Sequence, residues 1–401
     1  MHQKLRRIAL RHQGLAAQSH FGKGRQATER VIAHLGYVQI DTLSVVARAH
    51  HHTLWTRIPD YQPAYLDQLV SDGRVFEYWF HAASYLPMRD YRFVLPKMAA
   101  IKRGESRYYA NTDPKIVRQV LDRIRIDGPL KARDFESQRT RNGKWWNWKP
   151  TKHALEKLFM QGDLMITKRA GMEKVYDLTE RVLPSNTNTS KPSVLEFSEY
   201  LLNVSLRANG FTTLKQLTHL RPGTALRKAL TTVLQQKIAD GSVTEHAFDD
   251  LPTLYAARDV FERKIAPPAV QVRLLSPFDN AIIHRDRVQQ LFEFDYRLEC
   301  YLPKEKRQFG YFCLPILYRD QLVGQVDCKA HRKTGIFELI HLHLNDPIND
   351  LDHFIFHFTK TIYRFAAFNA CQSIRVSNIS PKKLAAAFKR ALNAVEQLRQ
   401  Y

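Results

Sequence analysis

The order of helical and strand-like segments between residues 114 and 178 is the feature that most restricts the fold. Apolar spacing and turn residues predict three helices and then two strands, at 116–126, 132–135, 150–160, 164–169 and 174–178. Gly128-Pro129 separates the first two helices, and Ala170-Gly171 joins the two strands. Three helices followed by a hairpin predict a winged helix over residues 113–184.

The same order recurs with weaker definition after a polar stretch at 185–192, which we interpret as a linker. Helical spacing covers 194–208, 214–220 and 222–239, and the turn Asp240-Gly241 precedes a strand-like run at 242–245. We therefore expect a second winged helix over 193–264. A similar order is possible near the N-terminus, so residues 1–112 are expected to form a winged-helix-like domain.

Strand signals dominate the chain from Val270 onward. Strand-like runs occupy 270–275, 310–318, 322–330 and 336–344, which predicts a β-rich domain over 268–346. Helices at 350–369 and 381–399 are expected to make up residues 347–401. The predicted fold class is α+β, with tandem winged-helix motifs followed by a β-rich C-terminal domain.

The charge of the chain indicates the class of its partner. Sixty-one Lys and Arg against 39 Asp and Glu leave a formal net charge of +22, which suits a polyanion. Nucleic acid is the leading partner. A membrane surface is less favoured because no single basic amphipathic helix dominates. A basic protein without any such partner is the alternative.

Further patterns exclude several classes of protein. No apolar run reaches membrane-spanning length and the N-terminus does not resemble a signal peptide, so we expect a cytoplasmic protein, associated with the nucleoid if DNA is its partner. The four cysteines are too far apart for a paired-thiolate metal site and fit small buried hydrophobic residues. A Gly-x-x-x-x-Gly-Lys loop is absent, and we expect no nucleotide cofactor.

Gln39-Ile40-Asp41 is the segment whose side chains are best suited to catalysis. In an extended segment alternate side chains project to one face, so Gln39 and Asp41 point together. A carboxylate and a carboxamide in one place can hold and polarise a water molecule. The alternative is structural, because Asp41 could cap a helix that starts near Leu43. The spacing leaves both interpretations open.

Several basic and aromatic side chains are candidates for contact with DNA. Lys149 and Lys152 lie at the start of the predicted recognition helix, where Trp145 and Trp146 fill either the groove or the protein core. Further candidates are Arg48 and Arg57, which follow the Gln39 segment, and the hairpin tip formed by His331, Arg332 and Lys333. The tip could instead be a solvated charged turn.

A metal site is not favoured. The run His50-His51-His52 suggests zinc, but three consecutive residues do not readily converge on one ion, and acidic or thiol partners at ligand spacing are missing. The His-x-Glu and Cys-x-x-Cys signature of zinc deaminases is also absent. We expect no metal cofactor.

The motifs in this order resemble those of the AlkZ/YcaQ winged-helix DNA glycosylases. The resemblance rests on segments 38–48, 77–82, 145–150, 175–179, 275–279 and 296–301. The family's catalytic element is Gln, an apolar residue, then Gln or Asp, and it falls here on Gln39, Ile40 and Asp41. The acidic third position makes the YcaQ (AlkX) branch the nearer match.

The resemblance implies a C-shaped protein whose concave basic face embraces duplex DNA. It also implies hydrolysis of the N-glycosidic bond of alkylated purines and the unhooking of interstrand crosslinks. Family members use a β-hairpin against the minor groove, which corresponds best to residues 331–335. A purine alkylated at N7 already carries a positive charge, so it can leave without a protonating acid, while Asp41 serves as base and Gln39 orients the water.

Two other classes of protein remain open at this stage. Basic charge and winged helices would equally suit a transcriptional regulator or an architectural DNA-binding protein. An RNA-binding accessory protein is a further possibility, and it would prefer single-stranded loops. The Gln39 and Asp41 pair separates a glycosylase from these, since a regulator needs no carboxylate that activates water. Several winged helices in one chain make a monomer sufficient.

Overall fold

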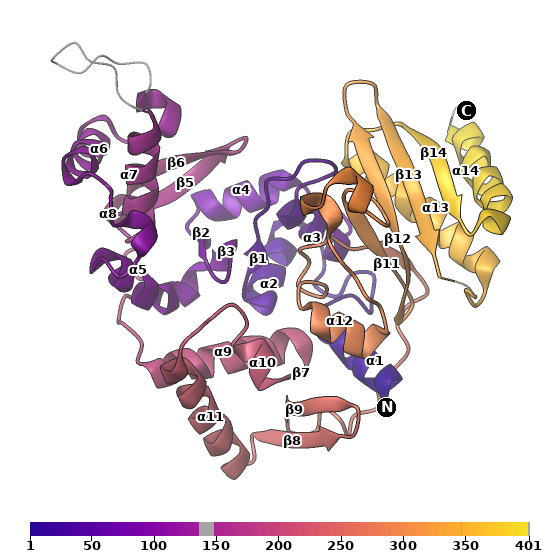
Figure 1. Cartoon of the computed structure of the whole chain (residues 1–401), viewed down its shortest axis with the longest axis horizontal. Helices are drawn as coiled ribbons and strands as arrows, with labels where there is room; N and C mark the ends of the chain where they lie inside the picture. The colour runs from indigo at the N-terminus through magenta and orange to yellow at the C-terminus, as the bar shows by residue number, and fades with distance from the viewer. Residues whose placement is uncertain (136–147, 346, 400–401) are drawn as a thin grey trace.

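The computed structural model describes residues 1–135, 148–345 and 347–399. Within them, one order of elements occurs three times: a helix, a short strand, further helical segments and a two-stranded hairpin. A larger sheet follows toward the C-terminus. In Figure 1 the first of the three units lies at the centre, the second at the left and the third below, while the C-terminal sheet lies at the right.

The first unit holds the Gln39 segment. Its elements are α2 (Gly24–Leu35), β1 (Val38–Gln39), α3 (Ala49–Arg57), α4 (Pro63–Ser71), β2 (Val75–Trp79) and β3 (Ala83–Pro87). The strands form a sheet in the order β1-β3-β2, in which Gln39 faces Ser84. The helices α1 (His2–His12) and α5 (Leu95–Lys102) flank the unit in sequence. A helix was expected from Leu43, but α3 begins only at Ala49, and residues 40–48 form a loop.

The second unit comprises α6 (Pro114–Asp127), β4 (Leu130–Lys131), α7 (Trp148–Met160), β5 (Leu164–Ala170) and β6 (Glu173–Leu178), followed by α8 (Thr179–Val182). Its strand order is β4-β6-β5. Asp113 caps α6 by accepting a hydrogen bond from the Lys115 N–H at 2.8 Å, and Pro114 occupies the first turn, where a missing N–H costs nothing. These elements fall within the range expected for a winged helix.

The third unit comprises α9 (Val194–Asn209), β7 (Phe211–Thr212), α10 (Leu214–Leu217), α11 (Thr224–Ala239), β8 (Val243–Phe248) and β9 (Leu251–Ala257). The strand order is again of the same type, β7-β9-β8. Helix α9 starts with a capping box, because Ser193 and Glu196 each bond the other's backbone N–H. The three helices and β8 follow the order that the sequence predicted for residues 193–264, whereas β7 and β9 were not predicted.

The C-terminal sheet is formed by β10 (Val272–Leu274), β11 (Cys313–Tyr318), β12 (Gln321–His331), β13 (Ile336–Leu344) and β14 (Ser373–Ser380), in that order. The helices of this part are α12 (Arg285–Phe292), α13 (Leu351–Phe368) and α14 (Ala385–Arg399). Strand β14 pairs in parallel with β13 and lies between the two last helices in sequence. Residues 347–401 were expected to contain helices only, but they also complete this sheet.

The first unit and the C-terminal sheet share one apolar core. Val31 and Leu54 of the first unit belong to the same buried cluster as Leu339 and Phe358 of the C-terminal part. Burying apolar surface is the main stabilising contribution to such contacts, at roughly 25 cal/mol per Å². The loop at 40–48 packs on this shared core through Ile40 and Val46. Among the described residues, no helix has the length and apolar character needed to cross a membrane.

Candidate active site

Gln39 and Asp41 lie on the less buried face of the end of β1. Val38 and Ile40 are buried, whereas Gln39 and Asp41 are half-buried. The N–H of Ile40 donates to the Ala83 carbonyl at 2.8 Å, which continues the pairing with β3 by one residue. This is the alternation expected for an extended segment, and it places the carboxamide and the carboxylate on one face.

The carboxylate of Asp41 is fixed by a turn in its own loop. Its Oδ2 accepts a hydrogen bond from the Leu43 N–H at 3.0 Å, an Asx turn. Asp41 does not cap a helix, because residues 40–48 are not helical. Burial raises the pKa of Asp41, and hydrogen bonds from the Leu43 and Thr42 N–H groups oppose that shift. A fixed carboxylate with a raised pKa is a suitable acceptor for a proton.

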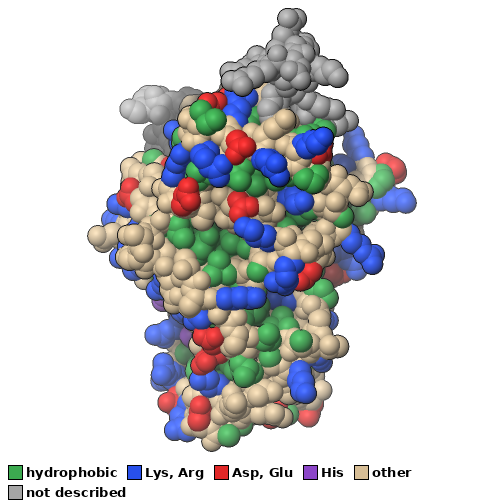
Figure 2. Space-filling model, turned by 90° about the vertical axis from the view of Figure 1, so that its left-hand side faces the viewer, with side chains coloured by type: hydrophobic (Ala, Val, Ile, Leu, Met, Phe, Trp, Pro, Cys, Tyr) green, Lys and Arg blue, Asp and Glu red, His purple; other side chains and the backbone are tan. Residues whose placement is uncertain are grey.

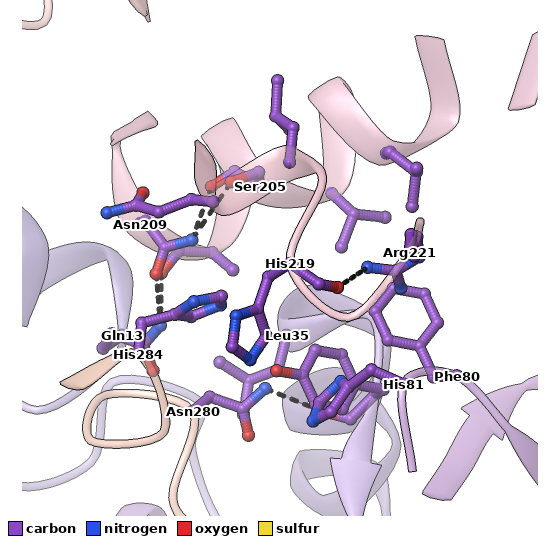
Figure 3. Close-up of a pocket in the computed structure, with 16 residues that line it drawn as sticks. Gln13, Leu35, Phe80, His81, Ser205, Asn209, His219, Arg221, Asn280 and His284 are labelled. Atoms are coloured by element: carbon purple, nitrogen blue, oxygen red, sulfur yellow. Dashed lines mark hydrogen bonds between the residues drawn. The ribbon is translucent and has the colours of Figure 1, made fainter. Parts of the chain in front are cut away.

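The carboxamide of Gln39 is held from the turn between β2 and β3. Its Oε1 lies 3.0 Å from Nε2 of His81, a buried side chain in that turn. His81 also lines a small cavity between the first unit, the third unit and the linker of residues 275–284, which joins β10 to α12 (Figure 3). In this cavity His219 and Arg221 come from the third unit, and Asn280 from the linker. Gln39 is therefore supported from the protein interior.

Two hairpins hold the loop that carries Asp41. Toward the β12–β13 hairpin, the Ala330 N–H donates to the Val45 carbonyl at 2.9 Å and Arg332 donates to the Ser44 carbonyl at 3.0 Å. Toward the β5–β6 hairpin, Arg48 reaches the Gly171 carbonyl at 3.5 Å. The fold thus brings together three segments that are far apart in the sequence.

Cations gather around the loop. Burial lowers the pKa of Arg48, and the positive charges of Arg169 and Arg332 lower it further, so these three guanidinium groups lie near one another. Arg169 is neutralised by a bidentate pair with the buried Glu77, at 2.7 Å for each bond. The remaining positive charge of Arg48 and Arg332 at the loop favours an anionic ligand such as a phosphate.

The hairpin tip at 331–333 is docked onto the loop. His331 pairs with Glu338 at 2.8 Å, and Arg332 also donates to the Asn369 side chain at 3.2 Å. Arg332 and Lys333 are exposed. The structure therefore places His331, Arg332 and Lys333 beside the loop of the Gln39 segment, with Lys333 directed to solvent and the other two held by protein partners.

Arg57 was expected to contact DNA, and the structure contradicts this. The side chain has no exposed surface and forms two hydrogen bonds with Asp279, at 2.7 and 2.8 Å. It also donates to the backbone carbonyl and the side chain of Gln13. With its donors committed to protein acceptors, the buried guanidinium joins α3 to the C-terminal part of the chain and cannot meet a phosphate.

The candidates on the second unit are described only in part. Trp145 and Trp146 lie outside the described residues. Lys149 belongs to α7, but its side chain is likewise outside them. Lys152 is exposed on α7. Figure 2, which faces this end of the molecule, shows Lys and Arg side chains spread over the surface with Asp and Glu between them, without one dominant basic patch.

The three consecutive histidines have structural partners. His52 donates from Nε2 to the Leu274 carbonyl at 2.9 Å, and His51 lies 2.8 Å from the Tyr61 hydroxyl. His50 is buried and packs on His51. Within residues 1–135, 148–345 and 347–399, no group of three or more His, Cys, Asp or Glu side chains is placed to hold a metal ion.

Sequence reasoning missed that the segment around Tyr301 lies near Asp41. Tyr301 is 76% exposed, an unusual state for a large aromatic residue. Partial desolvation raises the pKa of Tyr301 although its ring is largely exposed, and an ionised Cys300 and then the Asp41 carboxylate raise it further, so the phenol lies near Asp41. Glu299 anchors the segment by accepting from three backbone N–H groups, those of Gln308, Phe309 and Gly310. The sequence has a tyrosine at each end of 296–301, but this pattern does not predict by itself that the segment lies near Asp41.

Comparisons with known proteins identify the family and the fold of this chain. The model of the family described as DNA glycosylase AlkZ-like matches residues 32–368. The chain therefore belongs to the AlkZ-like family of DNA glycosylases. Among solved structures it is similar to the Streptomyces sahachiroi DNA glycosylase AlkZ, with a TM-score of 0.62 and 14% identity over 94% of this chain and 98% of that chain. At this identity the likeness shows a shared fold.

Proposed function

We propose that this protein hydrolyses the N-glycosidic bond of N7-alkylated purines in duplex DNA and unhooks interstrand crosslinks during DNA repair. The family supports a DNA glycosylase. The observation that carries the residue assignment is that Gln39 and Asp41 lie on one face of a strand end, in a loop that Arg48 and Arg332 flank. We further propose that the three repeated units are winged helices around a concave DNA-binding face.

The proposed reaction needs no protonating acid. Water attacks C1′ of the deoxyribose, and the bond from C1′ to N9 breaks as its electron pair moves into the purine and cancels the charge at N7. The attacking water gives its proton to Asp41, and Gln39 orients that water. The Asp41 carboxylate also stabilises the positive charge that develops on the sugar. The products are an alkylated base and an abasic site, which fits a monofunctional glycosylase.

The proposed substrate surface is open. A crosslinked base is tied to the opposite strand and cannot swing into a deep pocket. Arg48, Arg332 and Lys333 would contact phosphates near the lesion, and Lys149 and Lys152 would do so farther along the duplex. Tyr301 would meet a sugar or base beside Asp41, since an exposed aromatic ring offers a stacking face.

The experiment that tests this function uses duplex DNA with a single N7-methylguanine or a nitrogen-mustard crosslink. We expect the purified protein to produce alkali-labile sites, Asp41→Asn to produce none above background, and Gln39→Ala to act more slowly. Asp352→Asn on α13 removes the same charge from an exposed position and should cleave like wild type. Absence of cleavage by wild type would refute the function, whereas an active Asp41→Asn would refute only the assignment of the base.

A further inference from the structure

The contact between His81 and Gln39 joins the proposed catalytic motif to the protein interior. Nε2 of His81 lies 3.0 Å from Oε1 of Gln39, a normal hydrogen-bond distance. A carbonyl oxygen can only accept, so the ring nitrogen must donate. The carboxamide NH₂ group is then the end of the Gln39 side chain that His81 does not engage.

His81 remains neutral at physiological pH. Burial, the positive charge of Arg221 and that of His219 lower the pKa of His81 to about 3. A neutral imidazole carries one ring proton, and the contact with Gln39 requires it on Nε2. The side chain can therefore direct the carboxamide without bringing a second cation to the motif.

The surroundings of His81 hold its ring in place. The Tyr37 ring meets it edge-on at 4.9 Å between centroids, and the His219 ring of the third unit lies at 6.0 Å. The guanidinium of Arg221 covers the neighbouring Phe80 ring at 4.2 Å. Asn280 fixes Tyr37 by donating to its backbone carbonyl at 3.0 Å. Three separate parts of the chain thus determine where the His81 ring points.

The cavity beside His81 has a volume of about 50 Å³. Pockets that take up drug-sized ligands are roughly 300–1,000 Å³, so a purine base does not fit here. The cavity is not a receptor for an extruded base. We therefore consider the histidines and the arginine that line this cavity as residues that hold the Gln39 segment in place.

We propose that His81 is a positioning residue that fixes the carboxamide of Gln39 with its NH₂ group toward the nucleophilic water. This inference rests on the proposed function and specifies how Gln39 acts. With its oxygen engaged by His81, Gln39 donates a hydrogen bond to a lone pair of the water. Asp41 is then the group that accepts the water's proton. The two motif residues have different and non-exchangeable tasks.

Two substitutions separate the hydrogen bond from the packing. His81→Phe keeps a ring against Tyr37 but has no donor, whereas His81→Gln supplies a donor at a similar reach. We expect His81→Phe to lower the single-turnover rate constant about tenfold, the value of one ordinary hydrogen bond, with unchanged affinity for the duplex. His81→Gln should recover most of the rate. A His81→Phe enzyme as fast as wild type would overturn the inference.

A double variant tests whether the effect passes through Gln39. If His81 acts by positioning Gln39, then Gln39→Ala with His81→Phe should be no slower than Gln39→Ala alone. Additive losses would overturn the inference, because they would mean that His81 acts independently. Melting temperatures of all variants are measured alongside, since a purely structural role would lower stability without this coupling.

The tautomer is measured without substrate. In protein labelled with ¹⁵N-histidine, we expect the His81 ring, assigned by its loss in His81→Gln, to carry its proton on Nε2. A proton on Nδ1 would overturn the inference even in an active enzyme. The two levels of proposal fail differently: a wild type that releases no base refutes the function and this inference together, whereas an active wild type that is insensitive to His81 refutes the inference alone.

Discussion

Arg57 and Asp279 form an ion pair with no exposed surface on either side chain, with Nη1 to Oδ2 at 2.7 Å and Nη2 to Oδ1 at 2.8 Å. The pair joins helix α3, directly after the loop of the Gln39 segment, to the linker that follows β10. Removing one member leaves the other charge buried and unpaired, so we expect Arg57→Met to lower the free energy of unfolding by about 3–5 kcal/mol.

Urea denaturation measures this loss, and Arg297→Met is the matched control. Arg297 is exposed and pairs with Asp295 at 3.0 Å, so its replacement should cost less than about 1 kcal/mol. If both substitutions lower the free energy of unfolding by the same small amount, the buried pair stabilises the fold no more than the exposed pair does.

The proposed glycosylase should lose activity in acid because Asp41 must be ionised to accept a proton. Burial raises the pKa of Asp41 above the ordinary carboxyl value of about 4. As the pH is lowered, the rate constant should therefore begin to fall before the pH reaches about 4. Single-turnover rates across the acid range, with DNA binding measured at each pH, check this. A rate that stays constant down to about pH 4 would contradict the role of Asp41 as base.

The hairpin tip and helix α7 should contribute to the electrostatic part of DNA binding. Lys333→Ala and Lys152→Ala each remove an exposed positive charge. If each lysine meets one phosphate, each substitution should reduce the slope of log K against log salt by about 0.9 on any duplex sequence. Lys389→Ala, at an exposed position on α14, is the control and should leave the slope unchanged. An unaltered slope for either test variant removes that lysine from the interface.

Buried and half-buried histidines should make the fold sensitive to acid. Burial is the main cause that lowers the pKa of His34, His51 and His52 to about 4. In the unfolded chain histidines bind protons below about pH 6.5, while these folded ones stay neutral until about pH 4, so stability should fall between these values as the pH is lowered.

The melting temperature at about pH 7 and at about pH 4.5 measures this effect. His52→Gln keeps a donor for the Leu274 carbonyl but does not titrate, so the difference between the two temperatures should shrink in this variant. Identical melting temperatures of the wild type at the two pH values would contradict the prediction.

The local order of the second unit was predictable because its signals lie within a few residues of one another. Asp113 and Pro114 start α6, and Gly128 ends it with a positive φ of 84°. The alternation of Gln39 and Asp41 was predictable for the same reason, since it needs only an extended backbone. The prediction of a helix at Leu43 was wrong. The backbone carbonyls of residues 44 and 45 accept hydrogen bonds from a hairpin almost 290 residues away, and no local pattern reports such contacts.

The sequence by itself determined the repeated order of helices and hairpins, the positive charge and the motif Gln39-Ile40-Asp41, because propensity, periodicity and composition act over short separations. Only the tertiary structure decided that Arg57 is buried against Asp279, that Arg332 meets the loop of Asp41, and that His81 holds Gln39. These contacts depend on which side chains the packed core brings within about 3 Å, the distance at which hydrogen bonds form, and on which side chains it removes from water.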